Sequence, residues 1–162
     1  MSFQAWLQQA DSDLDAAQAL SAAQFHSQAV WLAAQAVENA HKALLVSLGL
    51  RYEESHFKKL GHRTGEISKL LPEALLAPPD LTIAAKIAAL ETKADSSRYP
   101  APDPQAPGAL LAPAGRITSS GQEVADAGAL VTWCKDRVAR AQAAVAAMSP
   151  AQPPAPPAAA GP

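Results

Sequence analysis

Apolar side chains recur every three or four residues in the first third of the chain, which is the spacing of an amphipathic helix. From residue 3 to about residue 22, these apolar positions are interleaved with Asp11, Asp13 and Asp15. Residues 24–48 carry a second, broader apolar face, and Gly49 follows as a residue that commonly ends helices. At about 25 residues, this segment is predicted to be the longest core helix.

The opposite face of the second segment is polar. Its side chains are those of Gln28, Gln35, Glu38, Asn39 and Lys42. Glu38 stands four residues before Lys42, which is the favourable order for an ion pair on a helix. The pattern therefore predicts a Glu38–Lys42 pair on this polar face.

Glycine and proline divide the rest of the chain into further helices. After a predicted loop over residues 50–61, a third helix is expected from about His62 to Pro72, and a fourth from about residue 80 to residue 96. Five prolines between residues 100 and 113 exclude a continuous helix or a central strand there, so a loop is predicted. The last helix is expected to start between residues 118 and 122 and to end near residue 148.

These elements predict an all-α fold, an up-and-down four-helix bundle with an additional short helix, over residues 1–148. Residues 149–162 contain six prolines and are predicted to form a disordered Pro/Ala-rich tail. With 39 alanines in 162 residues, helices can approach closely. Larger side chains are then expected to supply much of the buried area: Trp6, Phe25, Trp31, Leu44 and Trp133. On the last helix, the residues expected to face inward are Val124, Ala127, Val131, Cys134, Val138, Ala141 and Val145.

Composition narrows the functional classes. The net charge of −2 provides no global positive field for nonspecific nucleic-acid binding. Cys134 is the single cysteine, which excludes an internal disulfide and a multi-cysteine zinc site, and its place in an apolar stripe predicts a buried thiol rather than a nucleophile. Without a basic, apolar leader or a long apolar run, we expect a cytoplasmic protein with no membrane contact.

Common cofactor and metal signatures are missing from the sequence. It contains no P-loop, no dinucleotide fingerprint and no HExxH string. His26 and His41 are fifteen residues apart on one predicted helix, about 22 Å along its axis, too far to share an ion. His56 and His62 could meet in a loop but have no convergent carboxylate pair. We therefore expect no cofactor and no metal.

Two strings in the chain are distinctive: FHSQAVWLAAQAVENAHKALLVSLGL at residues 25–50 and SRYP at residues 97–100. They resemble the HEPN-domain family (higher eukaryotes and prokaryotes nucleotide-binding domain), in its Arg-Tyr-Pro-containing bacterial and archaeal branch. The first string resembles the family's second helix, and the matching positions are Gln35, Ala36, Glu38, Lys42, Ala43 and Leu44. His62 resembles the histidine that opens the next helix, and SRYP resembles the Arg-Tyr-Pro element before a proline-rich loop.

The resemblance, which spans about residues 3–147, implies a helical bundle of four or five helices that frequently forms homodimers. It also implies a partner, a minimal nucleotidyltransferase-type protein, often in a toxin–antitoxin pair. Many members are metal-independent ribonucleases with an arginine and, four to six residues later, a histidine on the last helix.

This sequence departs from that ribonuclease pattern, because no histidine follows Arg98. The spacing does occur at Arg51 and His56, but in the predicted loop after the second helix, and a motif this short arises readily by chance. Histidine and arginine can nevertheless supply proton transfer and phosphate binding. Arg51 and His56 are therefore the catalytic candidates if RNA is cleaved.

A ligand- or partner-binding site has better candidates. Arg98, close before Pro100, is expected on extended backbone, where its guanidinium can reach a carboxylate or a phosphate, and Tyr99 offers stacking. In one interpretation Arg98 pairs with Glu38 or another bundle acid and pins the proline-rich loop. In the other, a polar pocket receives a nucleotide or an acidic group of a partner, and its residues are Gln35, Glu38, Lys42, Arg98 and Tyr99, with His62 as a further candidate.

The only local basic cluster comprises Lys58, Lys59, His62, Arg63 and Lys69, and it is interrupted by Glu53, Glu54 and Glu66. A solvated loop explains this cluster better than an RNA site does. Three functions then remain: a noncatalytic HEPN-like module that works with a nucleotidyltransferase-type partner and binds a nucleotide, a ribonuclease with a displaced site, and a purely structural interaction bundle.

Overall fold

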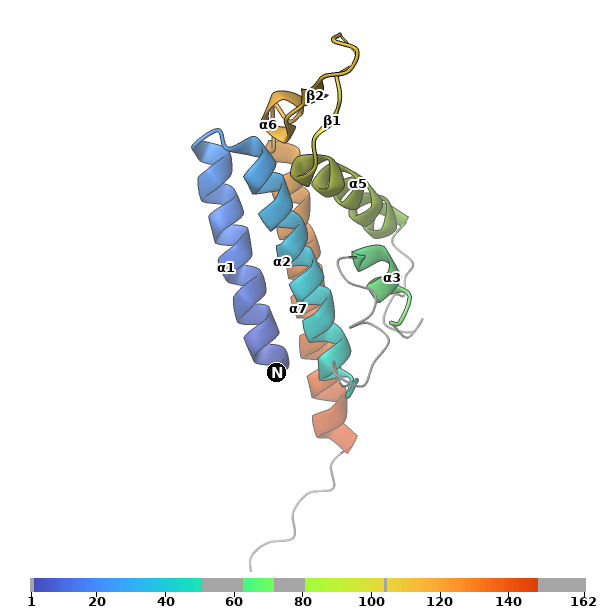
Figure 1. Cartoon of the computed structure of the whole chain (residues 1–162). Helices are drawn as coiled ribbons and strands as arrows, with labels where there is room; N and C mark the ends of the chain where they lie inside the picture. The colour runs from blue at the N-terminus through green and yellow to red at the C-terminus, as the bar shows by residue number, and fades with distance from the viewer. Residues whose placement is uncertain (1, 51–62, 72–80, 104, 149–162) are drawn as a thin grey trace, which may run out of the picture.

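Three long helices run side by side and form the body of the protein (Figure 1). The computed structural model describes residues 2–50, 63–71, 81–103 and 105–148. Helices α1 (Phe3–Ala22) and α2 (His26–Ser47) are joined by a tight turn, and α7 (Gly121–Met148) lies along both. Helix α5 (Leu81–Arg98) crosses them obliquely, with α3 (Thr64–Ser68) beside it. The predicted all-α bundle is confirmed.

The proline-rich segment carries a small hairpin rather than a plain loop. Strands β1 (Ala101–Pro102) and β2 (Leu110–Leu111) pair antiparallel, with Ala101 opposite Leu111. The turn between them uses Gly108, whose φ of 87° suits a residue without a side chain. The short helix α6 (Pro113–Arg116) follows and begins at a proline, as helices often do.

Local signals in the sequence explain where the first two helices begin and end. The side chain of Ser2 accepts a hydrogen bond from the amide of Ala5 (3.2 Å) and caps α1. Gly49 has a φ of 89°, and the amides of Gly49 and Leu50 donate to the carbonyls of Val46 and Leu45. This is a Schellman motif, so Gly49 ends α2 as predicted.

Helix α2 is the central element, because α1, α3, α5, α6 and α7 all contact it. The buried residues that α1 and α2 contribute to the main core cluster are mostly alanines: Ala10, Ala17, Ala29, Ala33, Ala36 and Ala40. Without larger side chains between them, the two helix axes can approach closely. Leu44, Leu45, Ile67 and Val138 form a second cluster towards the other end of α2.

Several predictions about element length and burial are wrong. Helix α7, with 28 residues, is longer than α2, with 22. The described part of the third helix is only Thr64–Ser68, because the chain turns at residues 69–71. Phe25 and Trp31, which were expected in the core, are 55% and 38% exposed. Val145 is also exposed, close to the end of α7.

The polar face of α2 is not a solvated face, because neighbouring helices cover much of it. Glu38 and Lys42 form the predicted ion pair, but both side chains are more than nine-tenths buried. The Lys42 ammonium lies 4.9 Å from the centre of the Trp6 ring on α1. One turn away, the amide of Asn39 donates to the carboxylate of Asp13, also on α1 (2.8 Å). These polar contacts fix the register of α1 against α2.

Ion pairs also fasten α7 to its neighbours. Lys86 on α5 pairs with Asp126 on α7 (3.0 Å), and Lys93 pairs with Glu123 (2.5 Å). Burial by itself would raise the pKa of the Asp126 carboxyl, but hydrogen bonds from Gln122 and Lys86, together with the Lys86 charge, outweigh burial and lower it. The α5–α7 contact is therefore partly electrostatic.

No helix in the described part of the chain has the length and apolar character needed to span a bilayer. The predicted tail at residues 149–162 lies outside the described residues, and so do residues 51–62, which contain most of the predicted basic cluster. The domain boundary at residue 148 stays a prediction.

Candidate functional site

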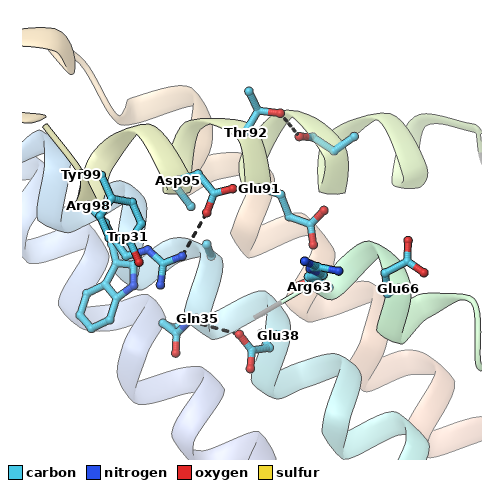
Figure 2. A pocket seen from close by; sticks show the side chains of 14 residues that line it. Trp31, Gln35, Glu38, Arg63, Glu66, Glu91, Thr92, Asp95, Arg98 and Tyr99 are labelled. Atoms are coloured by element: carbon cyan, nitrogen blue, oxygen red, sulfur yellow. Dashed lines mark hydrogen bonds and ion pairs between the residues drawn. The ribbon is translucent and has the colours of Figure 1, made fainter. Parts of the chain in front are cut away.

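A pocket of about 970 Å³ lies between α2, α3 and α5. Figure 2 shows the side chains that line it, with α5 on one side and α2 on the other. Trp31, Gln35 and Glu38 reach it from α2, since their spacing places them on one helix face. From α5 come Ala88, Glu91, Thr92, Ala94, Asp95 and Arg98, followed by Tyr99, and the remaining lining residues are Ala34, Arg63, Thr64 and Glu66.

Aromatic and cationic groups gather at one end of the pocket (Figure 2). Trp31 is 38% exposed and Tyr99 is 61% exposed. The Arg98 guanidinium lies 5.3 Å from the centre of the Tyr99 ring, and its Nη2 donates to the carboxylate of Asp95 (3.0 Å). This end therefore offers flat, solvent-accessible surfaces against which another planar group can stack.

The other end of the pocket is formed where α3 packs against α5. The carboxylate of Glu91 accepts a hydrogen bond from the amide of Gly65 (2.8 Å), at the beginning of α3. A Cβ atom at Gly65 would lie 3.2 Å from the Glu91 carboxylate, so a larger residue there would require Glu91 to shift slightly. Arg63 and Glu66 lie beside this contact in Figure 2.

The floor of the pocket is polar and joins the buried core. The Gln35 amide donates to Oε2 of Glu38 (3.2 Å), while Oε1 of Glu38 accepts from the Lys42 ammonium. The carboxylate of Glu38 therefore both lines the pocket and takes part in the buried ion pair. Lys42 itself points away from the pocket, towards Trp6.

Carboxylates outnumber cations in this lining. Glu38, Glu66, Glu91 and Asp95 face two guanidinium groups, those of Arg63 and Arg98. Lys42 balances the charge of Glu38 from behind, and the exposed Lys69 pairs with Glu66 (2.6 Å). The pocket therefore suits a ligand group with hydrogen-bond donors better than it suits a polyphosphate.

Four of the six predicted binding residues line this pocket: Gln35, Glu38, Arg98 and Tyr99. Lys42 does not reach the pocket, and His62, Arg51 and His56 lie outside the described residues. The structure brings the four residues together, and their role in binding stays a prediction. The sequence reasoning missed Trp31, Glu91 and Asp95, although Glu91, Asp95 and Arg98 are spaced by four and three residues and so share a helix face.

The predicted backbone of Arg98 is wrong. Arg98 is the last residue of α5, not part of an extended segment, because Tyr99 is the residue that immediately precedes Pro100. Arg98 does pair with an acid of the bundle, but among the described residues this acid is Asp95, one turn earlier on the same helix, rather than Glu38. The proline-rich segment is held instead by Arg116, whose Nη2 donates to the carbonyls of Ser96 (2.6 Å) and Tyr99.

A second cluster of chemically versatile side chains is sealed inside the core. His41 and Cys134 are both fully buried, with the Cys134 sulfur 3.5 Å from Nδ1 of His41. Burial lowers the pKa of His41 from 6.5 to about 4, although its hydrogen bond to the Val37 carbonyl opposes the shift. Burial raises the pKa of the Cys134 thiol. A substrate cannot reach either group, so the predicted buried role of Cys134 is confirmed.

Within the described ranges, no three histidine, cysteine or acidic side chains come together as a metal site would require. The pocket carboxylates are instead engaged by Lys42, Gln35, the Gly65 amide, Lys69 and Arg98. The chemistry available at the pocket is therefore stacking and hydrogen bonding.

Sequence comparison assigns this arrangement of helices to a family. A model of the HEPN domain matches residues 3–136, which is most of the chain. The chain belongs to the HEPN family. The predicted family is thereby confirmed, while the narrower branch stays a prediction. No curated protein matches the HEPN chain.

Solved structures agree with this assignment at the level of the fold. TT1696 from Thermus thermophilus is 21% identical, with a TM-score of 0.58 over 87% of this HEPN chain and 96% of TT1696. ST0689, described as an archaeal HEPN homologue, is 18% identical, with a TM-score of 0.52 over 90% of this chain and 98% of its own. At these identities, the likeness establishes that the HEPN fold is shared.

Proposed function

We propose that this HEPN chain is a noncatalytic module that binds a nucleotide in the pocket between α2, α3 and α5. The observation that supports this most directly is the exposed Trp31 and Tyr99 beside the Arg98 guanidinium at one end of that pocket. A nucleobase has a flat face that stacks on aromatic rings and on guanidinium planes. Exposed aromatic side chains of this kind are costly to leave in water and are typical of binding sites.

The acidic groups of the pocket suit the remaining polar parts of a nucleoside. Asp95 and Glu91 can accept hydrogen bonds from the amino group of a base or from ribose hydroxyls, and the Gln35 amide can both donate and accept. The excess of carboxylates, in turn, disfavours phosphate groups within this same pocket. The base and the sugar are therefore the parts that we place between α2 and α5.

Nucleoside titration tests this proposal. We expect adenosine or another nucleoside to bind the wild-type protein in isothermal titration calorimetry, and Trp31→Ala or Tyr99→Ala to weaken binding about tenfold through lost stacking. Leu110→Ala is the matched control, because Leu110 is 69% exposed but does not line the pocket. If no nucleoside or nucleotide binds, or if both pocket variants bind as the wild type does, the proposal is wrong and a purely structural bundle is favoured.

The proposed cellular role follows from the HEPN family. We propose that the chain forms a homodimer and works with a minimal nucleotidyltransferase-type protein in a toxin–antitoxin or defence setting. Light scattering on the purified protein should give twice the 16.8 kDa mass of the chain. Co-expression with a nucleotidyltransferase encoded by a neighbouring gene should yield a stable complex, and separate elution of the two proteins would contradict the partnership.

Incubation with RNA separates the noncatalytic module from the ribonuclease alternative. We expect RNA to stay intact, because no histidine follows Arg98 in the sequence and His41 is buried. Degradation by the wild-type protein that is lost in a His56→Ala variant would replace our proposal with the ribonuclease.

A further inference from the structure

A second, smaller pocket shares Trp31 and Arg98 with the pocket of Figure 2. It has a volume of about 250 Å³, enough for roughly eight water molecules. It is formed where the beginning of α2, the end of α5 and the beginning of α6 meet. Ser27 and Gln28 line it from α2, Ser97 from α5, and Ala112 and Pro113 from α6 and its N-cap.

The two pockets differ sharply in charge. No carboxylate lines the smaller pocket, and the only formal charge among its lining residues is that of Arg98. The larger pocket, in contrast, contains four carboxylates and two guanidinium groups. An anion that is repelled by the carboxylates of the larger pocket meets none in the lining of the smaller pocket, where the only charged side chain is the Arg98 guanidinium.

Two buried hydrogen-bond donors at the smaller pocket lack partners among the described residues. The hydroxyl of Ser27 has none, although Ser27 is only 6% exposed. The Nε–H of Arg98 also has none, because Asp95 is bonded to Nη2 instead. Leaving a donor buried and unpaired destabilises a protein, so two such donors on residues that line one pocket point to a ligand that accepts hydrogen bonds.

The backbone adds to this preference for an anion. Ser27 and Gln28 belong to the first turn of α2, whose amides have no acceptors within the helix, and no side chain caps that end. An uncapped helix N-terminus attracts anions. The opposing negative end of α5 is already neutralised, because Arg116 bonds the carbonyls of Ser96 and Tyr99, and the Ser97 hydroxyl bonds that of Ala94.

We propose that the smaller pocket is a subsite for a phosphate group, bound by the Ser27 hydroxyl, the Arg98 guanidinium and the first-turn amides of α2. Arg98 can serve both pockets, since its guanidinium carries five N–H donors and its bond to Asp95 uses Nη2 and leaves Nε–H for the phosphate. That this phosphate belongs to the nucleotide whose base stacks on Trp31 rests on the proposed function. The phosphate subsite itself rests on the donors and charges described above.

Inorganic phosphate is the first probe, titrated by calorimetry at low ionic strength. We expect wild-type binding that weakens as sodium chloride is added, and at least tenfold weaker binding in Ser27→Ala and in Arg98→Gln. Ser12→Ala, which removes an exposed hydroxyl on α1, is the matched control and should bind as the wild type does. Ser27→Ala should be at least as stable as the wild type, because the hydroxyl that it removes has no partner, so lost binding will not reflect unfolding.

Adenosine and adenosine monophosphate then separate the subsite from the proposed function. If both are correct, the monophosphate binds at least tenfold more tightly than the nucleoside, and this advantage disappears in Ser27→Ala. If phosphate binding requires Ser27 but the nucleoside does not bind, the subsite stands and the nucleotide function fails. Phosphate binding that is absent, or equal in the wild type and Ser27→Ala, overturns the subsite.

Discussion

The ammonium group of Lys42 lies 4.9 Å from the centre of the Trp6 ring, although the two residues belong to different helices. The same ammonium pairs with the Glu38 carboxylate, and both charged side chains are more than nine-tenths buried. A cation on α2 is thus enclosed between an aromatic ring of α1 and an acid of its own helix. This arrangement links the α1–α2 contact to the floor of the candidate pocket.

Replacing Lys42 should lower the stability of the folded protein. In Lys42→Met the Glu38 carboxylate stays buried without its cation, so we expect the free energy of unfolding to fall by about 3 kcal/mol. Lys69→Met is the matched control, because Lys69 and Glu66 form an exposed pair, and it should change stability by less than about 1 kcal/mol. Urea denaturation measures both variants. Equal effects of the two substitutions would show that burial of the Lys42 pair has no energetic consequence.

Acid should destabilise the fold through His41. Because burial lowers the pKa of His41 from 6.5 to about 4, the unfolded chain binds a proton in this interval that the folded protein does not. Stability should therefore fall as the pH drops from 6.5 to 4, with His41 contributing up to about 3 kcal/mol of that loss. Urea denaturation at several pH values should show a flatter dependence for His41→Leu. A slope in His41→Leu as steep as that of the wild type would assign the acid sensitivity to other groups.

Arg116 should hold the end of α5 in place. Its guanidinium bonds the carbonyls of Ser96 and Tyr99, so Arg116→Met leaves two carbonyl groups without that donor. We expect a loss of about 1–2 kcal/mol in the free energy of unfolding and faster amide exchange around residues 96–103. Arg140→Met, at an exposed position on α7, should change neither quantity. Unchanged exchange in Arg116→Met would mean that the hairpin and α5 are held by other contacts.

Cys134 should resist thiol reagents in the native protein. Burial raises the pKa of its thiol and removes the sulfur from solvent, so the reactive thiolate is both scarce and inaccessible. Modification by a disulfide reagent such as Ellman's should be far slower than that of glutathione and should accelerate to a similar rate in denaturant. Rapid labelling of the folded protein would show that the core opens locally around α7.

Periodicity and capping residues were sufficient to predict most of the helices. Gly49 ends α2 through a local motif, and Glu38 and Lys42 pair because they are one turn apart, so both could be predicted from nearby residues. Burial could not be predicted in the same way. In an alanine-rich helix, several faces are apolar enough to be buried. How much of Trp31 is exposed depends on the path of α5 across α2, and this path is determined by residues far away in the sequence.

The candidate site could be predicted in part for the same reason. The polarity of Gln35, Glu38, Arg98 and Tyr99 and their resemblance to family motifs predict a shared site, and these four residues do line one pocket. Asp95 was a local partner for Arg98 that helical spacing alone could have indicated. Glu91 acquires its role through the Gly65 amide, a contact between α5 and α3 that no local pattern encodes.

Glu38 divides its two carboxylate oxygens between different tasks, one towards Gln35 at the pocket floor and one towards Lys42 in the core. The shape of the pocket floor and the packing of α1 on α2 are consequently coupled in this protein. A replacement that reshapes the floor also disturbs the cation held against Trp6, so such a change would require compensating substitutions on α1.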